Sequence, residues 1–227
     1  MKTFKYLLAA VMLTIATAAS AQFANTGSKS GGFSLGTVKT DDYSRFKVSY
    51  LNADFSVEPE DEDFNVIFEE PLQGVSIEYL YGKHITQNLP LFVESGINIS
   101  WASSSVDKNR FEADLNFVYF TVPVNLAYKL SINDDFSIDP HFGLGFRFNV
   151  LAKESWEYDG YEKWSGSWFD KDDTDGDPAN RFQLCGQAGI GLCYQKLYLG
   201  WEYSWNFMEF ADDAKINGHY LSVGINF

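Results

Sequence analysis

Long runs of alternating apolar and polar residues constrain the fold of this chain more than any other feature. The clearest run follows Phe117, and its apolar face consists of Val118, Phe120, Val122, Val124, Leu126, Tyr128 and Leu130. A second run, at 136–150, has the same period. A period of two is that of a β-strand, and about ten residues is the length that a tilted strand needs to cross a membrane. These runs therefore predict long β-strands.

The same pattern continues toward both ends of the chain and gives eight strands in all. The six further strands are expected at 45–57, 73–85, 91–102, 182–195, 197–208 and 218–227. In the first of them the apolar set changes face between Tyr50 and Leu51, which predicts a β-bulge. A short additional strand at 32–38 is an alternative within a segment that is otherwise rich in Gly, Ser and Thr.

The connections between these strands alternate in length. Short ones, at 86–90, 132–135 and 195–196, follow the second, fourth and sixth strands. Long ones, at 58–72, 103–113, 151–179 and 209–217, follow the first, third, fifth and seventh. Short turns on one rim and long loops on the other are typical of outer-membrane barrels, with both termini on the periplasmic, short-turn side. We therefore predict an all-β fold, an eight-stranded antiparallel up-and-down transmembrane β-barrel at 43–227.

Side-chain volume indicates which face of the strands points outward. An eight-stranded barrel is just wide enough inside for side chains to fill it, so bulky residues such as Trp201, Trp205 and Phe146 fit poorly there. The opposite face carries glycines and a set of charges that are costly against hydrocarbon. That set is Glu78, Glu94, Lys129, Asp139, Arg147 and Glu202. We expect these charges to form a network in a polar lumen, with Arg147 paired with Glu202 or Glu78.

Large aromatic residues lie near both ends of the apolar face and predict two interfacial girdles. Tyr81, Tyr128, Tyr194 and Phe227 are expected toward the short turns, and Trp101, Phe182 and Trp205 toward the loops. A soluble barrel with an apolar lumen, like a lipocalin, is the alternative arrangement of the same alternation.

The first 21 residues have the form of a secretory signal peptide. Lys2 and Lys5 precede an apolar run that ends in Ala19-Ser20-Ala21, the small residues of a cleavage site. The run is shorter than the ~20 residues of a spanning helix, and no later run reaches ~18. We expect cleavage after Ala21, a flexible periplasmic segment at 22–42, and location in the outer membrane of a Gram-negative-type bacterium. A net charge of −14 argues against nucleic acid as a partner.

The last strand carries Leu221, Val223, Ile225 and the terminal Phe227 on one face. With the signal peptide, the eight strands and the loop asymmetry, it resembles the small barrels of the OmpA/OmpX, opacity-protein and PorT-like group. The resemblance covers nearly all of the mature chain and rests on pattern, so it implies fold and membrane and no particular activity. It also implies contact with outer-membrane lipid and lipopolysaccharide, and with the barrel-insertion machinery through the last strand.

The third long loop is rich in aromatic side chains. They are Trp156, Tyr158, Tyr161, Trp164 and Trp168, with a turn signal at Asp159-Gly160. Such a hairpin is either a surface for a partner or a unit that packs on itself or on the rim. The acidic residues that follow resemble part of a calcium loop, but Lys171 and Phe182 occupy two positions where ligands belong. We therefore expect a solvated acidic tip and no metal site.

Nothing in the sequence indicates catalysis or a cofactor. Cys185 and Cys193 lie in one expected strand, roughly 27 Å apart, too far for a disulfide. His219, with Ser222 and Glu209 near it in sequence, lacks a recognised nucleophile motif. We expect a non-enzymatic protein that presents acidic and aromatic loops to envelope or extracellular components. A lipid-modifying enzyme at the rim, a narrow pore or transport accessory, and a soluble periplasmic binding barrel are the alternatives.

Overall fold

The part of the chain that the computed structural model describes comprises residues 41–57, 71–86, 89–108, 111–158, 161–171, 178–211 and 214–227, and it contains β-strands and no helix. Eight long strands form the wall: β1 (Tyr43–Val57), β2 (Leu72–His84), β3 (Leu91–Lys108), β4 (Phe111–Tyr128), β6 (Phe136–Tyr158), β8 (Phe182–Tyr194), β9 (Leu197–Asn206) and β10 (Ala214–Asn226). Two short strands, β5 (Leu130–Ser131) and β7 (Trp164–Ser167), each pair with β6.

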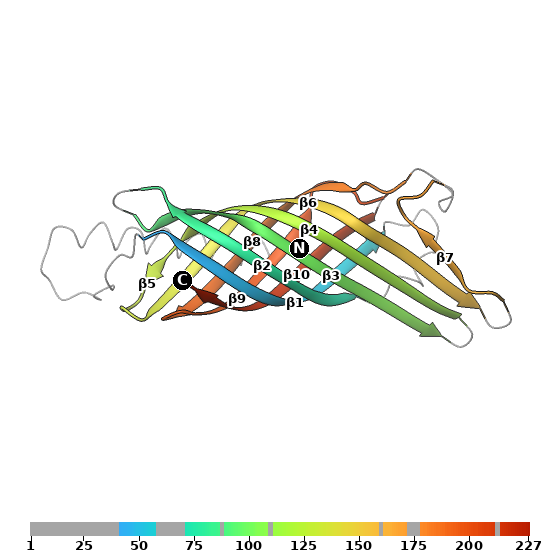
Figure 1. The fold of residues 1–227 in the computed structure, drawn as a ribbon, viewed down its shortest axis with the longest axis horizontal. Coiled ribbons are helices and arrows are strands. Elements are labelled where there is room, and N and C mark those ends of the chain that lie inside the picture. Colours follow the sequence, from blue (N-terminus) through green and yellow to red (C-terminus); the bar gives the residue numbers. More distant parts are fainter. Residues whose placement is uncertain are drawn as a thin grey trace, which may run out of the picture.

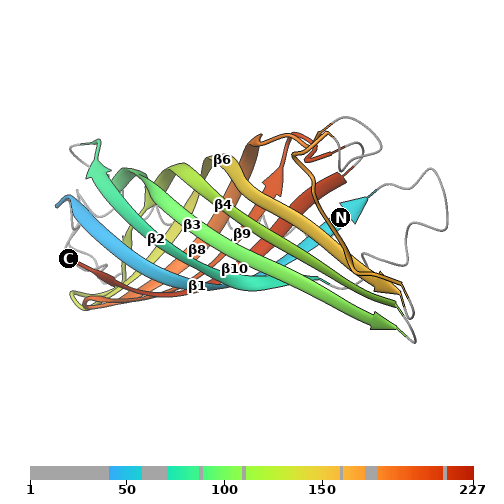
Figure 2. The same ribbon diagram turned by 45° about the vertical axis from the view of Figure 1, so that its right-hand side comes forward.

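Each long strand pairs antiparallel with its neighbours along the chain, and β1 pairs with β10, so the sheet closes on itself. The closing register runs from Arg45↔Asn226 to Val57↔Ala214. Figures 1 and 2 show the tilted strands around a common axis, and Figure 1 shows β7 near one end and β5 near the other. The predicted eight-stranded antiparallel barrel is confirmed.

Three adjacent strands reach beyond the rest of the wall at the loop end (Figure 2). β3 and β4 have 18 residues each and β6 has 23, whereas β9 has 10. With β7 they form a loop-side sheet, β3-β4-β6-β7. Much of what the sequence pattern predicted as loop, at 103–113 and 151–179, is therefore strand. The sequence pattern did not indicate these strand segments, because their outer faces carry small and polar residues in place of apolar ones.

The expected bulge at Tyr50 is wrong. The register of β1 with both β2 and β10 runs without a break through Tyr50 and Leu51. What changes is the environment of the strand. On the N-terminal side of Tyr50, apolar side chains of β1 such as Val48 point outward. On its C-terminal side, Leu51 and Phe55 are buried inside and Asp54 is exposed. The apolar set changes face because the surroundings of the wall change, not because the backbone shifts.

A register shift does occur in β6, at the same boundary. Val118 of β4 faces Leu151, but the next residue, Tyr119, faces Asn149, which leaves Val150 as the extra residue. Before the shift Asn149 is buried inside the barrel, and after it Ala152 is. The bulge places Ala152, and not Leu151, on the inner face of β6 as this strand enters the loop-side sheet.

Two apolar clusters lie across the interior, one toward each end. The loop-end cluster contains Leu51, Ala53, Phe55, Leu72, Ala102, Leu115, Phe117, Tyr119, Ala152, Ala179, Phe210, Ala214, Ile216 and Tyr220, with Trp168 and Phe169 packed against it. The turn-end cluster contains Tyr43, Phe92 and Ala127. Between the two, the interior is polar.

Gly96 marks a close approach of two strands. It lies opposite Leu80, and a Cβ atom there would overlap the carbonyl oxygen of Tyr79 in the backbone of β2. Since that oxygen cannot move without breaking the pairing, Gly96→Ala should lower the free energy of unfolding by about 1–3 kcal/mol. The temperature at which the folded barrel changes its migration on a gel measures this.

Gly218→Ala is the matched control, because a Cβ there meets side-chain atoms of Ala53 and Leu51 at 3.1 Å. It should lower the unfolding temperature less than Gly96→Ala. Equal unfolding temperatures for the two variants would contradict the steric role of Gly96.

Candidate functional site

The polar interior is organised around Arg45. Its guanidinium lies 2.8 Å from a carboxylate oxygen of Asp139 and 3.4 Å from one of Glu94. It also lies 3.9 Å from the ring centroid of Tyr198. The Tyr43 hydroxyl donates to Glu94 as well. Arg45, Asp139 and Glu94 are almost fully buried, so the two acids have a counter-ion where water is scarce.

A second group of ion pairs surrounds Lys47. Its ammonium lies 3.2 Å from Glu78 and 3.8 Å from Glu202, and His141 lies 3.0 Å from the same Glu202 oxygen. Asn98 donates to Glu78 at 2.8 Å. Lys47 stands directly opposite Glu78 in the register of β1 and β2, so strand pairing itself brings these charges together.

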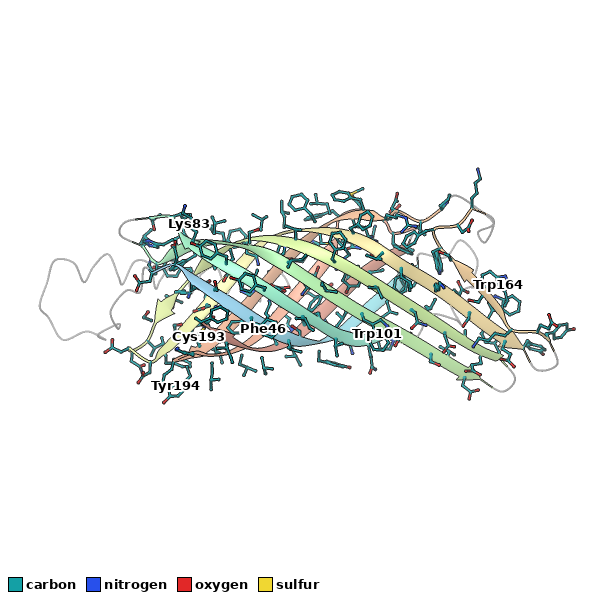
Figure 3. The ribbon with its side chains drawn as sticks, in the orientation of Figure 1. Phe46, Lys83, Trp101, Trp164, Cys193 and Tyr194 are labelled. Atoms are coloured by element: carbon teal, nitrogen blue, oxygen red, sulfur yellow. The ribbon has the colours of Figure 1, made fainter. Side chains whose placement is uncertain are left out.

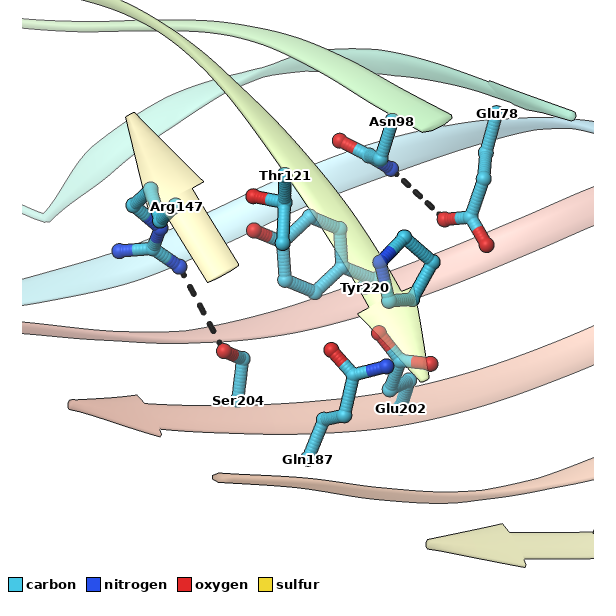
Figure 4. A pocket seen from close by; sticks show the side chains of 9 residues that line it. Glu78, Asn98, Thr121, Arg147, Gln187, Glu202, Ser204 and Tyr220 are labelled. Atoms are coloured by element: carbon cyan, nitrogen blue, oxygen red, sulfur yellow. Dashed lines mark hydrogen bonds between the residues drawn. The ribbon is translucent and has the colours of Figure 1, made fainter. Parts of the chain in front are cut away.

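Arg147 does not form the ion pair that the sequence predicted. It is 2% exposed, donates to Ser204 at 3.4 Å, and lies 4.4 Å from the ring centroid of Tyr119. Figure 4 shows Arg147 bonded to Ser204 on one side of a cavity and Glu78 on the other. The prediction of a pair with Glu202 or Glu78 is wrong, because Lys47 takes both carboxylates and the β6 register sets Arg147 beside uncharged Thr121.

The structure places the other expected lumen charges inside the barrel as well. Lys129 lies near the turn end, with its ammonium 3.0 Å from the ring centroid of Tyr43. The cavity in Figure 4, lined in part by Arg147, Gln187 and Tyr220, has a volume of about 10 Å³. That is about the space of one water molecule, so this cavity has no room for an organic ligand.

Lys47 and Arg45 also belong to the buried network, but the sequence pattern did not identify them as lumen charges. The apolar set of β1 changes face at Tyr50, and this change obscures the regular inner positions of the strand. The alternation of Tyr43, Arg45, Lys47 and Ser49 against Phe46 and Val48 was the available signal.

The candidate base His219 and the candidate nucleophile Ser222 do not come together in the structure. His219 points outward and its ring lies 5.8 Å from that of Trp201 and 4.7 Å from that of Tyr203. Ser222 points inward and shares a hydrogen bond of 2.8 Å with Ser49. Because the histidine and the serine lie on opposite faces of β10, they cannot act as base and nucleophile.

The described residues offer few features of a redox, metal or helical membrane site. Cys185 and Cys193 are free and buried. Within the described ranges, no group of three or more His, Cys, Asp or Glu side chains is arranged to hold a metal ion, and no helix has the length and hydropathy to cross a membrane. The acidic runs at 58–63 and 172–177 lie outside the described residues, as do the predicted signal peptide and residues 22–40. The calcium prediction therefore stays a prediction.

The aromatic residues of the third loop divide between two places. Trp156 of β6 and Trp164 of β7 stack with centroids 5.7 Å apart, and Tyr158 lies 5.9 Å from Tyr161, which is 72% exposed. Trp168 instead packs into the loop-end cluster, 5.9 Å from Phe55 and 5.7 Å from Phe210. One part of this loop is thus an exposed hairpin, and the other part packs against the loop-end cluster.

The last strand presents its apolar residues outward. Leu221, Val223, Ile225 and Phe227 are 50–65% exposed, and the backbone of Phe227 bonds to Ser44 in both directions. Most of the expected girdle aromatics are exposed too: Tyr81, Trp101, Phe182, Tyr194 and Phe227 are 45–65% exposed, and Trp101 and Tyr194 point away from the wall in Figure 3. Trp205 is partly buried, and Tyr128 is 7% exposed and contributes no surface to a girdle.

An outer groove lies on the loop-side sheet, next to Trp101. It has a volume of about 320 Å³ and is lined by Trp101, Asn116, Val118, Leu151, Lys153, Glu154, Ser155 and Ser165. This volume is within the range of small-molecule sites. The outer groove joins an apolar floor to polar and charged walls.

No protein-family model matches the sequence, and no curated protein matches it. Among solved structures, the attachment invasion locus protein Ail of Yersinia pestis is similar with a TM-score of 0.50 and 15% identity, over 82% of this chain and 99% of Ail. Ail in complex with the heparin analogue sucrose octasulfate gives the same values. Neisserial surface protein A is similar with a TM-score of 0.43 and 12% identity, over 82% of this chain and 95% of its own. The chain has the fold of the small eight-stranded outer-membrane barrels.

The two buried arginines should differ in their effect on stability. Arg45→Met leaves Asp139 and Glu94 buried without their cation, which should cost about 3–5 kcal/mol. Arg147→Met removes one hydrogen bond and a ring contact, which should cost about 1–2 kcal/mol. Heating the folded protein in one detergent and following its migration on a gel compares the two. An Arg147→Met barrel that unfolds at a lower temperature than Arg45→Met would contradict the network described above.

Proposed function

We propose that this chain is an outer-membrane protein of a Gram-negative-type bacterium, exported by a cleaved signal peptide at 1–21. In this proposal the barrel at 43–227 is a non-enzymatic anchor, and it holds the loop-side sheet and the acidic and aromatic loops outside the cell. These loops contact envelope or extracellular components. The single observation that carries the proposal is the apolar outer surface of a barrel whose interior is polar.

Apolar residues are exposed on the outer face of several strands in the part of the wall nearer the short turns. Ile77, Ile99, Leu144, Leu199 and Val223 come from five different strands and are 41–60% exposed. Soluble monomers rarely expose a contiguous apolar patch of more than a few hundred Å². A belt of such residues around a closed barrel is the surface expected against lipid, where closure also leaves no unpaired strand edge.

The filled interior argues against two of the alternatives. A lipocalin-like carrier needs an apolar cavity, but between the two apolar clusters the interior holds ion pairs and a cavity of about 10 Å³. A pore needs a continuous water path, but the loop-end cluster spans the interior with large rings such as Phe55, Phe117 and Phe210. Both features favour an anchor whose function lies on its outer surface.

A rim enzyme has less support than a surface protein, because His219 and Ser222 lie on opposite faces of β10. The exposed Trp156–Trp164 and Tyr158–Tyr161 pairs offer rigid aromatic area of the kind that partners use. Ail has been solved with a sulfated sugar. The net charge of −14 in this chain disfavours a polyanion of that type as the partner of its loops.

Lipid contact and assembly complete the proposal. Leu221, Val223, Ile225 and Phe227 form the outward face of the last strand, and we assign to it the contact with the barrel-insertion machinery. The remaining apolar belt contacts outer-membrane lipid and lipopolysaccharide.

Topology can be tested by cysteine labelling of intact cells. Tyr161→Cys lies in the exposed hairpin, whereas Asp134→Cys lies in the short turn between β5 and β6. Since Cys185 and Cys193 are buried, they give little background. A membrane-impermeant maleimide should label Tyr161→Cys at least tenfold faster than Asp134→Cys, and disruption of the outer membrane should remove the difference. Faster labelling of Asp134→Cys would show that the topology is opposite to the proposed one.

Conductance measurements distinguish a barrel that acts as an anchor from one that acts as a pore. The refolded barrel in a planar bilayer should give no stable channel steps in salt solution, because apolar side chains cross its interior at the loop end. Replacing both Phe55 and Phe117 by Ala is the matched control, since it removes two rings of that cluster and should raise any leak current. Stable channel openings of the unmodified barrel would contradict the proposed anchor function and favour a pore.

A further inference from the structure

We propose that the loop end of the barrel binds an arginine side chain of a basic partner protein, at a rim site formed by Glu154, Trp156 and Trp164. The inference rests on the proposed function, because it needs the loop-side sheet to lie outside the cell. It deepens that function by naming the chemistry of one partner, a guanidinium that stacks on an indole ring and pairs with a carboxylate.

The strand registers place the rim site on the inner face of the loop-side sheet. β6 pairs with β4 without a shift from Leu151 to Tyr158. In this register Glu154 faces Leu115, a buried member of the loop-end cluster, and Trp156 follows it on the same face. Trp156 also stands opposite Trp164 of β7. The rim site therefore faces the barrel axis and not the surrounding lipid.

The two tryptophans of the rim site form an exposed aromatic surface. Their rings stack with centroids 5.7 Å apart and an angle of 29° between the planes, yet Trp156 remains 37% exposed. Figure 3 shows Trp164 at the loop end of the molecule. The face of an indole ring attracts a cation within about 6 Å of its centroid, and tryptophan is the strongest of the aromatic residues in this respect. A cation on this surface is thus stabilised by the ring.

Glu154 supplies a carboxylate without a counter-ion. It is partly buried, and it forms no ion pair in the described part of the chain. The cations around it are engaged or turned away: Lys153 lies on the opposite face of β6, Lys163 lies 3.5 Å from Asp114, and Arg181 donates to two backbone carbonyls of β6. A carboxylate that is partly removed from water attracts a cation more strongly than an exposed one does.

The charge around the rim site also favours a basic partner. Residues 111–116, 151–158 and 161–167 together contain five acidic and two basic side chains, and the whole chain has a net charge of −14. Tyr158 and Tyr161 extend the aromatic surface toward the tip of the hairpin and are 46% and 72% exposed. This area is larger than a single small cation covers, so it fits a side chain that belongs to a protein.

The spacing of the rim site favours arginine over lysine. Alternate residues of a strand are about 7 Å apart, so a cation on the ring of Trp156 is within reach of the Glu154 side chain. A guanidinium is planar, stacks on aromatic rings and donates two parallel hydrogen bonds to a carboxylate, whereas an ammonium is a point charge. Trp, Tyr and Arg are also the residues that most often dominate binding between proteins.

Binding of a labelled peptide to the refolded full-length mature barrel tests the inference. The probe is a fluorescein-labelled hexa-arginine peptide, and its anisotropy is measured in a zwitterionic detergent at about 0.15 M salt, where distant charges are screened. Glu154→Gln should weaken binding about five- to tenfold, because a charge-assisted hydrogen bond is lost. Trp156→Leu, which stays apolar, should weaken binding about two- to fivefold.

Glu157→Gln and Trp201→Leu are the matched controls. Glu157 faces Glu112 on the outer face of the same strand, so its removal changes the net charge equally without touching the rim site. Trp201 lies on β9. Both variants should bind the peptide as the unmodified barrel does. Equal weakening by Glu154→Gln and Glu157→Gln would overturn the inference, because the peptide would then respond only to net charge.

Changes in the peptide test the same contact on the unmodified barrel, so the result does not depend on how well a variant folds. Hexa-citrulline keeps the shape of arginine without its charge and should bind at least tenfold more weakly. Hexa-lysine should also bind more weakly than hexa-arginine. If either peptide binds as tightly as hexa-arginine, the rim site does not recognise a guanidinium and the inference is wrong.

Labelling of intact cells separates this inference from the proposed function. If Tyr161→Cys is labelled from outside but Glu154→Gln leaves peptide binding unchanged, only the arginine inference fails. If Tyr161→Cys is not reached from outside, the proposed function fails, and the rim site has no access to an extracellular partner.

Discussion

The pairing of β1 with β10 is the constraint on which the rest of this structure depends. An open sheet of eight strands leaves two rows of backbone N–H and C=O groups without partners, and no water replaces those partners in a membrane. Closure removes both edges and encloses an interior of fixed width. Side chains from opposite parts of the wall fill that width, and closure brings Arg45 within 2.8 Å of Asp139, 94 residues further along the chain.

The wall has two segments with opposite polarity. Toward the short turns the outside is apolar and the inside carries ion pairs, whereas toward the loops the inside is the apolar cluster around Phe117 and Phe210. The first segment is arranged for contact with lipid and the second resembles the core of a soluble protein. β1 crosses the border with an unbroken register, and β6 crosses it with a bulge at Val150. The outer groove lies at this same border, which is why it joins apolar and polar surfaces.

The function inferred for this chain depends on surfaces more than on a buried centre. The interior is occupied by its own ion pairs and rings, so it stabilises the barrel and leaves little space for a ligand. The aromatic hairpin and the outer groove are both carried by the loop-side sheet, which stands on the three longest strands. Long strands are stiffer supports than loops, and a rigid support reduces the ordering cost of binding.

The sequence by itself determined the strand number, the antiparallel topology and the composition of the two faces, because alternation is a local property of each strand. It also identified Glu78 and Arg147 as inner residues. It did not determine which charges meet, since Lys47 reaches Glu78 and Glu202 only through the pairing of four strands, β2, β1, β10 and β9. Nor did it reveal the loop-side sheet, the packing of Trp168 against the loop-end cluster, or the outer groove. Those features depend on closure and on contacts between residues far apart in the chain, which only the tertiary structure decides.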